Sequence, residues 1–218
     1  MKRAQNIVDH YVISDVEKPN DMYTTPKYYR IIKSIFDILF ALTIFIITFP
    51  VIICFCILTI LESKGSPFYF QQRIGLNGKK FNVIKIRSMK IDAEQNGAQW
   101  ATKNDPRITK VGTFIRKTRI DELPQVINVL KGDMSIIGPR PEREIFTEQF
   151  EKEMPGFKKR LRVKPGLTGW AQVNGGYDIS PAEKLKLDLY YINNQSLRLD
   201  IKILLKTIRV VITGDGAR

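Results

Sequence analysis

The chain has 218 residues, of which 44% are hydrophobic and 26% are charged, so it has room for one globular domain and a membrane segment but not for two full domains. This composition excludes both a disordered chain and a protein made mostly of membrane spans. Lysine and arginine outnumber aspartate and glutamate by 13, which indicates an anionic partner: nucleic acid, anionic lipid headgroups or a phosphorylated substrate.

The first 27 residues form a polar, proline-containing stretch that predicts a loosely packed arm. His10, the single histidine, lies in this arm, and Cys54 and Cys56 lie two residues apart in an apolar run. A helix would point these two thiols to different sides, so neither a disulfide nor a cysteine metal site is expected. A single histidine in a polar arm also makes histidine-based catalysis unexpected. Catalysis therefore has to rely on carboxylates, lysine, arginine, hydroxyls or a divalent ion.

Residues 38–61 contain no charged side chain and are mostly Ile, Leu, Phe and Val. As a straight helix this run would reach ~36 Å, enough to cross a hydrocarbon core of ~30 Å. Pro50 interrupts the run, and basic residues flank it on both sides, so the charges define no orientation. These residues leave two alternatives open: a kinked span, or a re-entrant hairpin that returns to the face it entered. We divide the chain into an arm at 1–27, a membrane segment at 28–63 and a globular domain at 64–218.

Two strands joined by an Asn-Gly turn are predicted directly after the membrane segment, over residues 66–72 and 80–89. Side chains alternate along a strand, which places Lys85 and Arg87 side by side on one face of the second strand. Two neighbouring cations can bind an anion, but a solvated strand face explains the same spacing.

Short amphipathic segments and turn-rich segments alternate through the rest of the chain, which predicts several short helices rather than a large sheet. Together with the two strands they indicate an α+β fold. The expected segments are a loop at 92–107, short helices at 108–115 and 123–130, a Gly/Pro-rich loop at 132–141, an amphipathic stretch at 142–162, a second loop at 164–170 and a helical tail at 181–213.

The densest group of polar residues surrounds Asp121 and Glu122. Pro124 is tolerated only in a first helical turn, so Asp121 is expected near the N-cap and Glu122 just inside the helix. There the helix dipole and the neighbouring Arg116 and Arg119 should keep a carboxylate ionised. An ionised carboxylate among cations can attack phosphorus, and its neighbour can hold a divalent ion or manage a proton. An Asp-Glu pair is also common at the start of an ordinary helix, and this alternative stays open.

One arginine, Arg140, lies between Pro139 and Pro141 in the Gly/Pro-rich loop. The two prolines restrict the backbone and can fix the direction of the guanidinium group, whose planar fork suits phosphate oxygens. An arginine for phosphate, an acidic pair for Mg²⁺ and access to lipid together favour phosphoryl transfer.

Three blocks of residues resemble the conserved motifs of the bacterial sugar transferases, the monotopic phosphoglycosyl transferases. Several long motifs in the right order are far more specific than one short pattern, and the resemblance extends over residues 33–213. The blocks are Gln72-Arg73-Ile74-Gly75 with Phe81 and Lys85-Ile86-Arg87-Ser88-Met89; Asp121-Glu122-Leu123-Pro124-Gln125 with Asn128-Val129-Leu130-Lys131-Gly132-Asp133-Met134-Ser135 and Gly138-Pro139-Arg140-Pro141; and Pro165-Gly166-Leu167-Thr168-Gly169-Trp170-Ala171-Gln172-Val173-Asn174-Gly175.

The resemblance implies that Asp121 attacks the β-phosphate of a UDP-sugar, releases UMP and carries the phospho-sugar until polyprenyl phosphate displaces it. It implies that Glu122 assists, as a Mg²⁺ ligand or in activating the lipid phosphate, and that Arg140 contacts the substrate phosphates. Mg²⁺ is the expected cofactor, with both carboxylates as candidate ligands. The further candidates are Lys85, Arg87 and Arg119 for phosphate binding, and Pro139, Pro141, Gln172 and Asn174 for a loop near the nucleotide-sugar.

The resemblance also implies a proline-broken re-entrant helix at 28–63, with Pro50 as the break, a catalytic domain at 64–218 and amphipathic helices that rest at the membrane interface. The expected partners are a UDP-sugar, polyprenyl (undecaprenyl) phosphate and the lipid of the bacterial inner membrane, at its cytoplasmic face. Nucleic acid is not an expected partner, because too few aromatic residues alternate with the basic ones. The oligomeric state, including a homodimer, is left open.

One residue departs from the pattern of the family. Many relatives carry arginine after the Gln-Val-Asn-Gly run, whereas Gly176 follows Gly175 here, so recognition of the sugar can differ.

The main alternative function is a membrane-anchored basic module that binds anionic lipid or nucleic acid. It would explain the charge and the apolar run, but not the surroundings of the Asp-Glu pair and Arg140.

Overall fold

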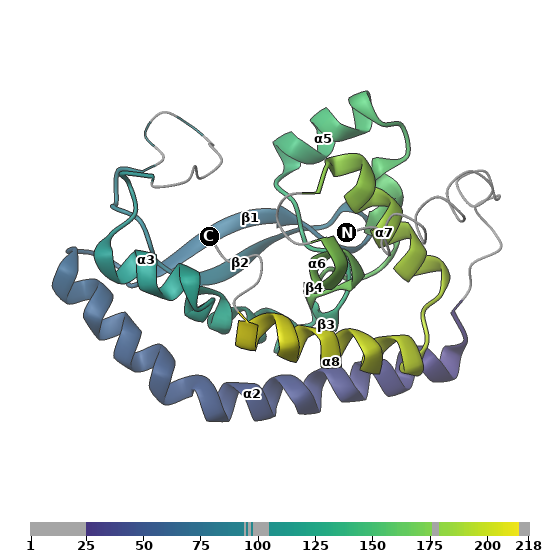
Figure 1. The fold of residues 1–218 in the computed structure, drawn as a ribbon, viewed down its shortest axis with the longest axis horizontal. Coiled ribbons are helices and arrows are strands. Elements are labelled where there is room, and N and C mark those ends of the chain that lie inside the picture. Colours follow the sequence, from purple (N-terminus) through teal and green to yellow (C-terminus); the bar gives the residue numbers. More distant parts are fainter. Residues whose placement is uncertain (1–24, 94, 96, 98–104, 176–178, 214–218) are drawn as a thin grey trace.

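The computed structural model describes residues 25–93, 95, 97, 105–175 and 179–213. Most of the N-terminal arm lies outside these residues. One long helix, α2 (Lys27–Glu62), runs along one side of the molecule, and the other labelled elements all lie on the same side of this helix (Figure 1). Two small sheets and several short helices complete an α+β fold, as the sequence predicted.

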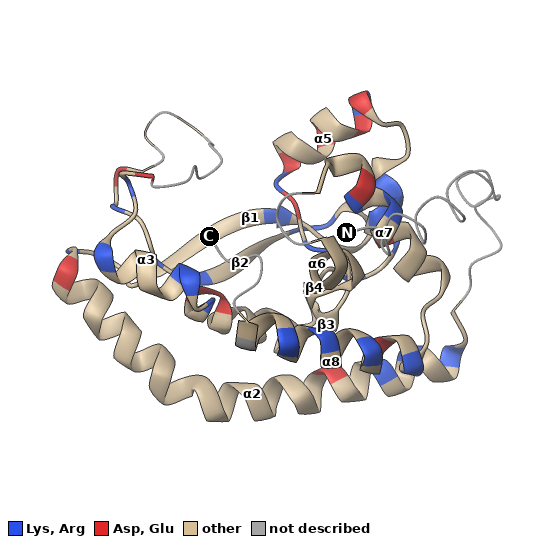
Figure 2. Cartoon of the chain, in the orientation of Figure 1, with Lys and Arg blue, Asp and Glu red and all other residues tan. Residues whose placement is uncertain are grey.

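α2 is long and apolar enough to cross a membrane, judged by its 36 residues and by a mean hydropathy of 3.0 over 18 of them. Most of its surface is exposed, and Figure 2 shows no charged residue between its first turns and Glu62 at its far end. Pro50 lies inside the helix, which continues through this residue instead of ending there. Figure 1 shows α2 as bent, with both ends on the same side of the bend. One missing backbone donor can bend a helix without unwinding it.

Polar contacts attach both ends of α2 to the rest of the molecule. Near the N-terminal end, the buried Asp37 carboxylate accepts a hydrogen bond from the Ile136 amide (3.0 Å), and the Tyr29 hydroxyl donates to Asp200 of the last helix (2.8 Å). At the C-terminal end, the Glu62 carboxylate accepts hydrogen bonds from two backbone amides at the start of the next helix (2.7 and 2.8 Å). These contacts fix the position of α2 relative to the globular part.

β1 (Phe68–Ile74) and β2 (Lys80–Ile86) form the predicted antiparallel hairpin. The Asn-Gly turn lies in a single 3₁₀ turn, η1 (Leu76–Gly78), in which Asn77 and Gly78 have positive φ angles of 53° and 80°. Asparagine and glycine tolerate these angles best, which explains why the chain reverses here. The first strand lies two residues further along the chain than expected, and the second ends three residues earlier.

Three short helices connect the hairpin to the second sheet: α3 (Lys110–Lys117), η2 (Ile120–Gln125) and α4 (Val126–Leu130). They confirm the two amphipathic patterns predicted in this region, although the second begins as a 3₁₀ helix. The buried Asn128 side chain fixes α4 against β2, because it accepts one backbone hydrogen bond from that strand (3.1 Å) and donates another (2.7 Å).

β3 (Ser135–Ile137) pairs in parallel with β4 (Gly166–Thr168), in a region where the sequence predicted loops. Strands of three residues are too short to show an alternating pattern. The two backbones also approach closely, since a Cβ atom on Gly138 would lie 2.3 Å from the Lys164 carbonyl oxygen. The glycines that indicated loops are therefore required for close packing.

Three of the remaining helices, over residues 170–175, 181–193 and 197–213, share one apolar core with β2, β3, α4 and part of α2. The expected amphipathic stretch consists of an α-helix and a 3₁₀ helix, the expected helical tail consists of two helices, and one further short helix was not predicted. These elements are α5 (Glu144–Glu153), η3 (Phe157–Arg162), α6 (Trp170–Gly175), α7 (Pro181–Asn193) and α8 (Leu197–Thr213).

Candidate active site

η2 carries the Asp-Glu pair and packs against β2. Its N-cap is Arg119, which has a left-handed backbone (φ 59°), so Asp121 lies inside the first turn rather than at the expected N-cap. Pro124 precedes α4, and its missing amide donor therefore interrupts no α-helical hydrogen bond. The Asp121 side chain is buried and that of Glu122 is half-buried. A tight turn thus holds two adjacent carboxylates against the strand that carries Lys85.

Glu122 binds two of the cations that the sequence analysis selected. The Lys85 ammonium group lies 2.8 Å from Oε1 of Glu122, and the Arg140 guanidinium group bridges both carboxylate oxygens, with 3.2 Å between Nη1 and Oε2. A bidentate contact of arginine with a carboxylate is both strong and directional. The structure therefore brings Lys85, Glu122 and Arg140 together beside Asp121.

The two carboxylates differ in their acidity. Burial, followed by the negative charge of Glu122, raises the pKa of Asp121 to about 6. Burial alone would raise the pKa of Glu122 too, but the charges of Arg140 and Lys85 outweigh it and hold that pKa well below its usual range. The sequence predicted that neighbouring cations keep a carboxylate ionised. In the structure this holds for Glu122, whereas burial makes Asp121 the weaker acid.

The loop that carries Arg140 is held by hydrogen bonds to three successive carbonyl groups. Arg160 of η3 donates to the Arg140 carbonyl oxygen (2.9 Å), and Arg73 of β1 donates to the Pro141 carbonyl oxygen (3.1 Å). The Pro139 carbonyl oxygen accepts a hydrogen bond from an amide of β4 (2.9 Å). The surrounding fold therefore fixes the backbone from which the Arg140 guanidinium group extends.

Arg160 is itself bound by a buried carboxylate. Its Nε and Nη2 atoms donate to Oδ2 of Asp188 at 3.1 and 2.6 Å, and both side chains are only 2% exposed. Its guanidinium group also lies over the Phe157 ring, 4.9 Å from the centroid. Glu142 lies 3.6 Å from Arg73 and 3.8 Å from Arg160 and so joins the two arginines into one charge network behind the loop.

Arg160→Met is expected to lower the free energy of unfolding by about 3–5 kcal/mol, because it leaves the Asp188 carboxylate buried without its partner. Thermal unfolding measures this loss as a fall in Tm. Lys158→Met, which removes an exposed charge two residues away, should leave Tm unchanged. Replacing both members of the pair, Arg160→Met with Asp188→Leu, should restore part of the loss. A single variant as stable as the Lys158 control would contradict the role given to this pair.

The structure does not bring Arg87 to the acidic pair. Its guanidinium group donates to the carbonyl oxygens of Ser63 and Lys64, with 2.9 Å to Lys64, and it is 7% exposed. Arginine at this position satisfies carbonyl groups at the C-terminal end of α2. Phosphate binding by Arg87 stays a prediction that no contact in the structure supports. Arg119 is half-buried at the start of η2.

Gln172 and Asn174 lie on α6 rather than in a loop. The Gln172 side chain donates to a carbonyl group of β4 (3.0 Å). Asn174 donates to a carbonyl group within its own helix (2.7 Å) and accepts a hydrogen bond from Lys206 of α8. Both side chains therefore hold α6 to its neighbours. Gly176, the departure from the family pattern, lies outside the described residues.

The acidic pair has few ligands for a metal ion. No group of three or more His, Cys, Asp or Glu side chains that could hold a metal occurs among the described residues. Glu122 uses both oxygens for Lys85 and Arg140, whereas Asp121 has no hydrogen-bond or ion-pair partner in the described part of the chain. Mg²⁺ commonly takes one or two protein carboxylates and completes its shell with water and substrate phosphates. The pair therefore fits Mg²⁺ that binds together with a diphosphate.

Sequence reasoning missed the residues that hold the Arg140 loop from behind. The available signal was the presence of charges inside amphipathic patterns, such as Asp188 between two leucines of the tail. Most charges in amphipathic helices face solvent, so the pattern alone could not identify the ones that point inward. The missed residues are Arg73, Glu142, Arg160, Lys184 and Asp188.

Comparison with known proteins gives a consistent result. A family model described as bacterial sugar transferase matches residues 28–214. An Aeromonas hydrophila protein named UDP-N-acetylgalactosamine-undecaprenyl-phosphate N-acetylgalactosaminephosphotransferase is 48% identical over 193 residues, which cover 87% of this chain and 46% of that relative. The UDP-glucose:undecaprenyl-phosphate glucose-1-phosphate transferase of Escherichia coli (strain K12) is 41% identical over 207 residues, which cover 89% of this chain and 45% of that relative.

A shorter relative matches over most of its own length. This Bacillus subtilis (strain 168) protein is provisionally named an undecaprenyl-phosphate N-acetylgalactosaminyl 1-phosphate transferase. It is 59% identical over 160 residues, which cover 73% of this chain and 89% of the relative. The chain thus spans about half the length of the Aeromonas and Escherichia proteins but nearly all of the Bacillus one.

Proposed function

Because the chain belongs to the bacterial sugar transferase family, we propose that it transfers a sugar-1-phosphate from a UDP-sugar to polyprenyl phosphate and releases UMP. The observation that carries this proposal is the cluster at η2. There the Asp121 carboxylate, which has no hydrogen-bond or ion-pair partner among the described residues, lies beside Glu122, Lys85 and Arg140. The names of the Aeromonas and Escherichia relatives supply the substrates, since each contains a UDP-sugar and undecaprenyl phosphate.

In the first step, an oxygen of the ionised Asp121 carboxylate attacks the phosphorus atom that bears the sugar. A new P–O bond forms while the bond from this phosphorus to the bridging oxygen breaks, and UMP leaves with that oxygen and its electron pair. Arg140 and Lys85 compensate the charge on the diphosphate oxygens. To do so, these two side chains transfer part of their contact with Glu122 to the substrate.

In the second step, a phosphate oxygen of polyprenyl phosphate attacks the same phosphorus atom. The bond to Asp121 breaks, the carboxylate is regenerated, and polyprenyl-diphosphate-sugar leaves. A covalent intermediate divides one difficult reaction into two easier ones. It also allows a single small site to accept a soluble nucleotide-sugar and a membrane lipid in turn.

Mg²⁺ is included in the proposal because the pair fits an ion that binds with the diphosphate. Asp121 and Glu122 would hold it, and when bound it would supply additional positive charge at the phosphate oxygens. Glu122 is ionised at neutral pH, owing to its low pKa, and so keeps Lys85 and Arg140 oriented before substrate binds.

We further propose that α2 enters the cytoplasmic leaflet of the bacterial inner membrane as a re-entrant helix. Three features support this placement: the exposed apolar surface of α2, its bend with both ends on one side (Figure 1), and basic residues at both ends. Both ends would then lie on the side of the membrane where UDP-sugars are found.

The leaving group distinguishes this reaction from ordinary glycosyl transfer. The protein, reconstituted in lipid with Mg²⁺ and undecaprenyl phosphate, should release UMP from at least one member of a panel of UDP-sugars. UDP-N-acetylgalactosamine is the first to test, because two of the similar proteins are named for N-acetylgalactosamine. Release of UDP instead of UMP would show that the sugar moves without its phosphate and would contradict the proposal.

The rate of UMP release is expected to fall below pH 6. Asp121 has to be ionised to attack, and its pKa is raised to about 6, so the rate should decrease about tenfold per pH unit below that value. The pKa of Glu122 is held well below its usual range, so this residue stays ionised across the same window. A pH profile of kcat/KM measures the effect, and a rate that stays constant down to pH 4.5 would contradict the assignment of Asp121.

A further inference from the structure

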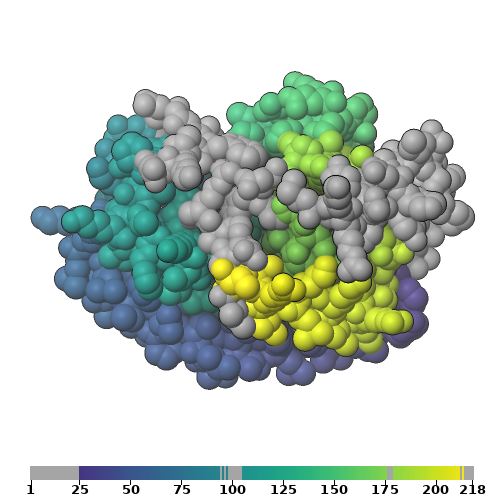
Figure 3. Space-filling view, in the orientation of Figure 1, coloured from purple at the N-terminus to yellow at the C-terminus, as the bar shows by residue number. Residues whose placement is uncertain are grey.

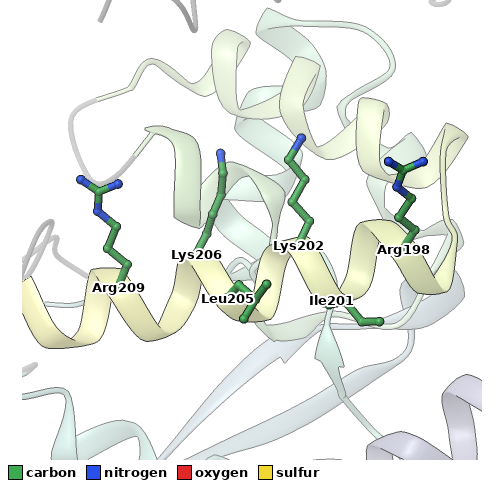
Figure 4. Close-up of a pocket in the computed structure, with 6 residues that line it drawn as sticks. All are labelled: Arg198, Ile201, Lys202, Leu205, Lys206 and Arg209. Carbon is green, nitrogen blue, oxygen red and sulfur yellow. The ribbon is translucent and has the colours of Figure 1, made fainter.

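We infer that α8 carries a binding surface for the headgroups of anionic phospholipids. Four cations lie on one side of this helix at intervals of three or four residues, and Figure 4 shows their side chains extending in the same direction. These residues, the basic row, are Arg198, Lys202, Lys206 and Arg209. None of them forms an ion pair with a carboxylate in the described part of the chain.

The basic row is not balanced by acidic residues of its own helix. The one acidic residue of α8, Asp200, is buried and accepts hydrogen bonds from the hydroxyl groups of Tyr29 and Tyr191 (2.8 and 3.0 Å). Like charges one helical turn apart repel each other. An anionic partner that binds along the row would remove this repulsion.

The middle of the row is held in place by an aromatic ring. The ammonium groups of Lys202 and Lys206 lie 5.3 and 4.7 Å from the centroid of the buried Trp170 ring, within the range of a cation–π contact. Lys206 also donates to Asn174. The two lysines are thus directed by contacts with α6, which distinguishes the row from an ordinary solvated helix face.

A second face of α8, next to the basic row, is apolar and exposed. Ile201, Leu205, Ile208 and Val211 are each more than half exposed, and Figure 4 shows that Ile201 and Leu205 extend in a different direction from the four cations. A helix with a basic face next to an apolar face lies in the plane of a membrane interface, with its cations at the level of the headgroups.

The position of α8 beside α2 supports a lipid partner. Asp200 of α8 contacts both Tyr29 and Lys33 of α2, at 2.8 and 3.4 Å, and Figures 1 and 3 show α8 alongside the N-terminal half of α2. This inference rests on the membrane placement of α2 proposed above. With α2 in the leaflet, α8 is attached at the N-terminal end of α2, where the chain enters the hydrocarbon region.

The length of the row favours a lipid surface over a single phosphate group. From Arg198 to Arg209 the helix advances ~16 Å, too far for one phosphate to contact all four cations. Several headgroups of a leaflet can bind along this length at the same time. The apolar face would enter the same leaflet, so one surface explains both faces of the helix.

Hydrogen exchange of the full chain in nanodiscs tests this inference without any transfer reaction. Amides of α8 should exchange more slowly in discs that contain phosphatidylglycerol than in discs of phosphatidylcholine alone. We expect roughly a fivefold difference for each cation that binds a headgroup, which corresponds to about 1 kcal/mol per cation. High salt should remove the difference, because it screens charges at the membrane surface.

A variant pair isolates the basic row from overall charge. Arg198, Lys202 and Arg209 replaced together by Gln should abolish the dependence on phosphatidylglycerol. The matched control replaces Lys79, Lys152 and Lys186 by Gln, removes the same charge elsewhere, and should retain the dependence.

Three outcomes overturn the inference: equal exchange in both discs, loss of the effect in the control variant, or protection by a trace of undecaprenyl phosphate in phosphatidylcholine discs, which would indicate a site for one phosphate. Failure of the membrane placement is distinguishable, because the addition of discs would then leave the exchange rates of the α2 amides unchanged.

Discussion

Asp121→Asn is expected to lower the rate of UMP release by a factor on the order of 10⁴ or more, the size of effect known for the loss of a catalytic nucleophile. The amide has nearly the shape of the carboxylate but cannot form the covalent intermediate. Release of UMP from a UDP-sugar by the reconstituted protein measures the effect. A variant that retains more than a tenth of the rate would remove Asp121 from its assigned role.

The same substitution is expected to stabilise the fold at neutral pH, which excludes unfolding as the cause of lost activity. The pKa of Asp121 is raised from 3.8 to about 6 in the folded protein. The folded state therefore disfavours the ionised form, and stability that is present below pH 3.8 is lost as the pH rises through 6. Asparagine carries no charge, so the variant should be more stable by about 1–3 kcal/mol at pH 8 and should lose this advantage near pH 4. Thermal unfolding at the two pH values measures the difference.

Arg140→Met is expected to lower kcat/KM by about 10²–10³-fold, because it removes a fixed charge that would bind the diphosphate oxygens. Its second effect separates this role from simple loss of folding. The Arg140 charge lowers the pKa of Asp121, so the acid limb of the pH profile should move to higher pH in the variant. The pH dependence of kcat/KM reports both effects.

Two further variants complete the test of Arg140. Arg140→Lys keeps the positive charge but loses the planar fork that bridges both oxygens of Glu122, so its rate should lie between those of the wild type and the Met variant. Lys152→Met removes an exposed charge on α5 and should leave the rate unchanged. An Arg140→Met variant with an unshifted acid limb would contradict the electrostatic coupling of Arg140 to Asp121.

The motif-bearing part of the candidate site could be predicted from sequence because each signal is local. An Asp-Glu pair before a proline, and an arginine between two prolines, restrict the backbone within a few residues, and the structure places Glu122 in contact with both Arg140 and Lys85. The hairpin followed in the same way from its Asn-Gly turn, and the long apolar helix from its uncharged run.

The supporting structure could not be predicted because it depends on contacts between distant residues. Arg160 and Asp188 are 28 residues apart, and each appears in the sequence as an ordinary polar position of an amphipathic helix. Alternation predicted Arg87 on the same strand face as Lys85, yet in the structure Arg87 follows the end of β2 and binds the end of α2, because a helix end with open carbonyl groups lies nearby. Periodicity carries no information about which neighbour lies opposite a side chain.

Burial also changes the chemistry expected from the motif. From the sequence, both carboxylates of the pair have the same cationic neighbours. In the structure, Glu122 receives the direct contacts of Lys85 and Arg140, and Asp121 is left buried with a raised pKa. This division gives the pair one carboxylate that organises cations and one that is available to react.

The most direct test is to look for the phosphorylated sugar on the protein itself. The reconstituted protein is mixed with Mg²⁺ and a UDP-sugar that releases UMP, without a lipid acceptor, and its intact mass is measured after rapid acid quenching. We predict an added mass equal to one sugar-phosphate group, located by peptide mapping at Asp121 and released when polyprenyl phosphate is added. Turnover without any such adduct, or an adduct on another residue, would contradict the covalent role of Asp121.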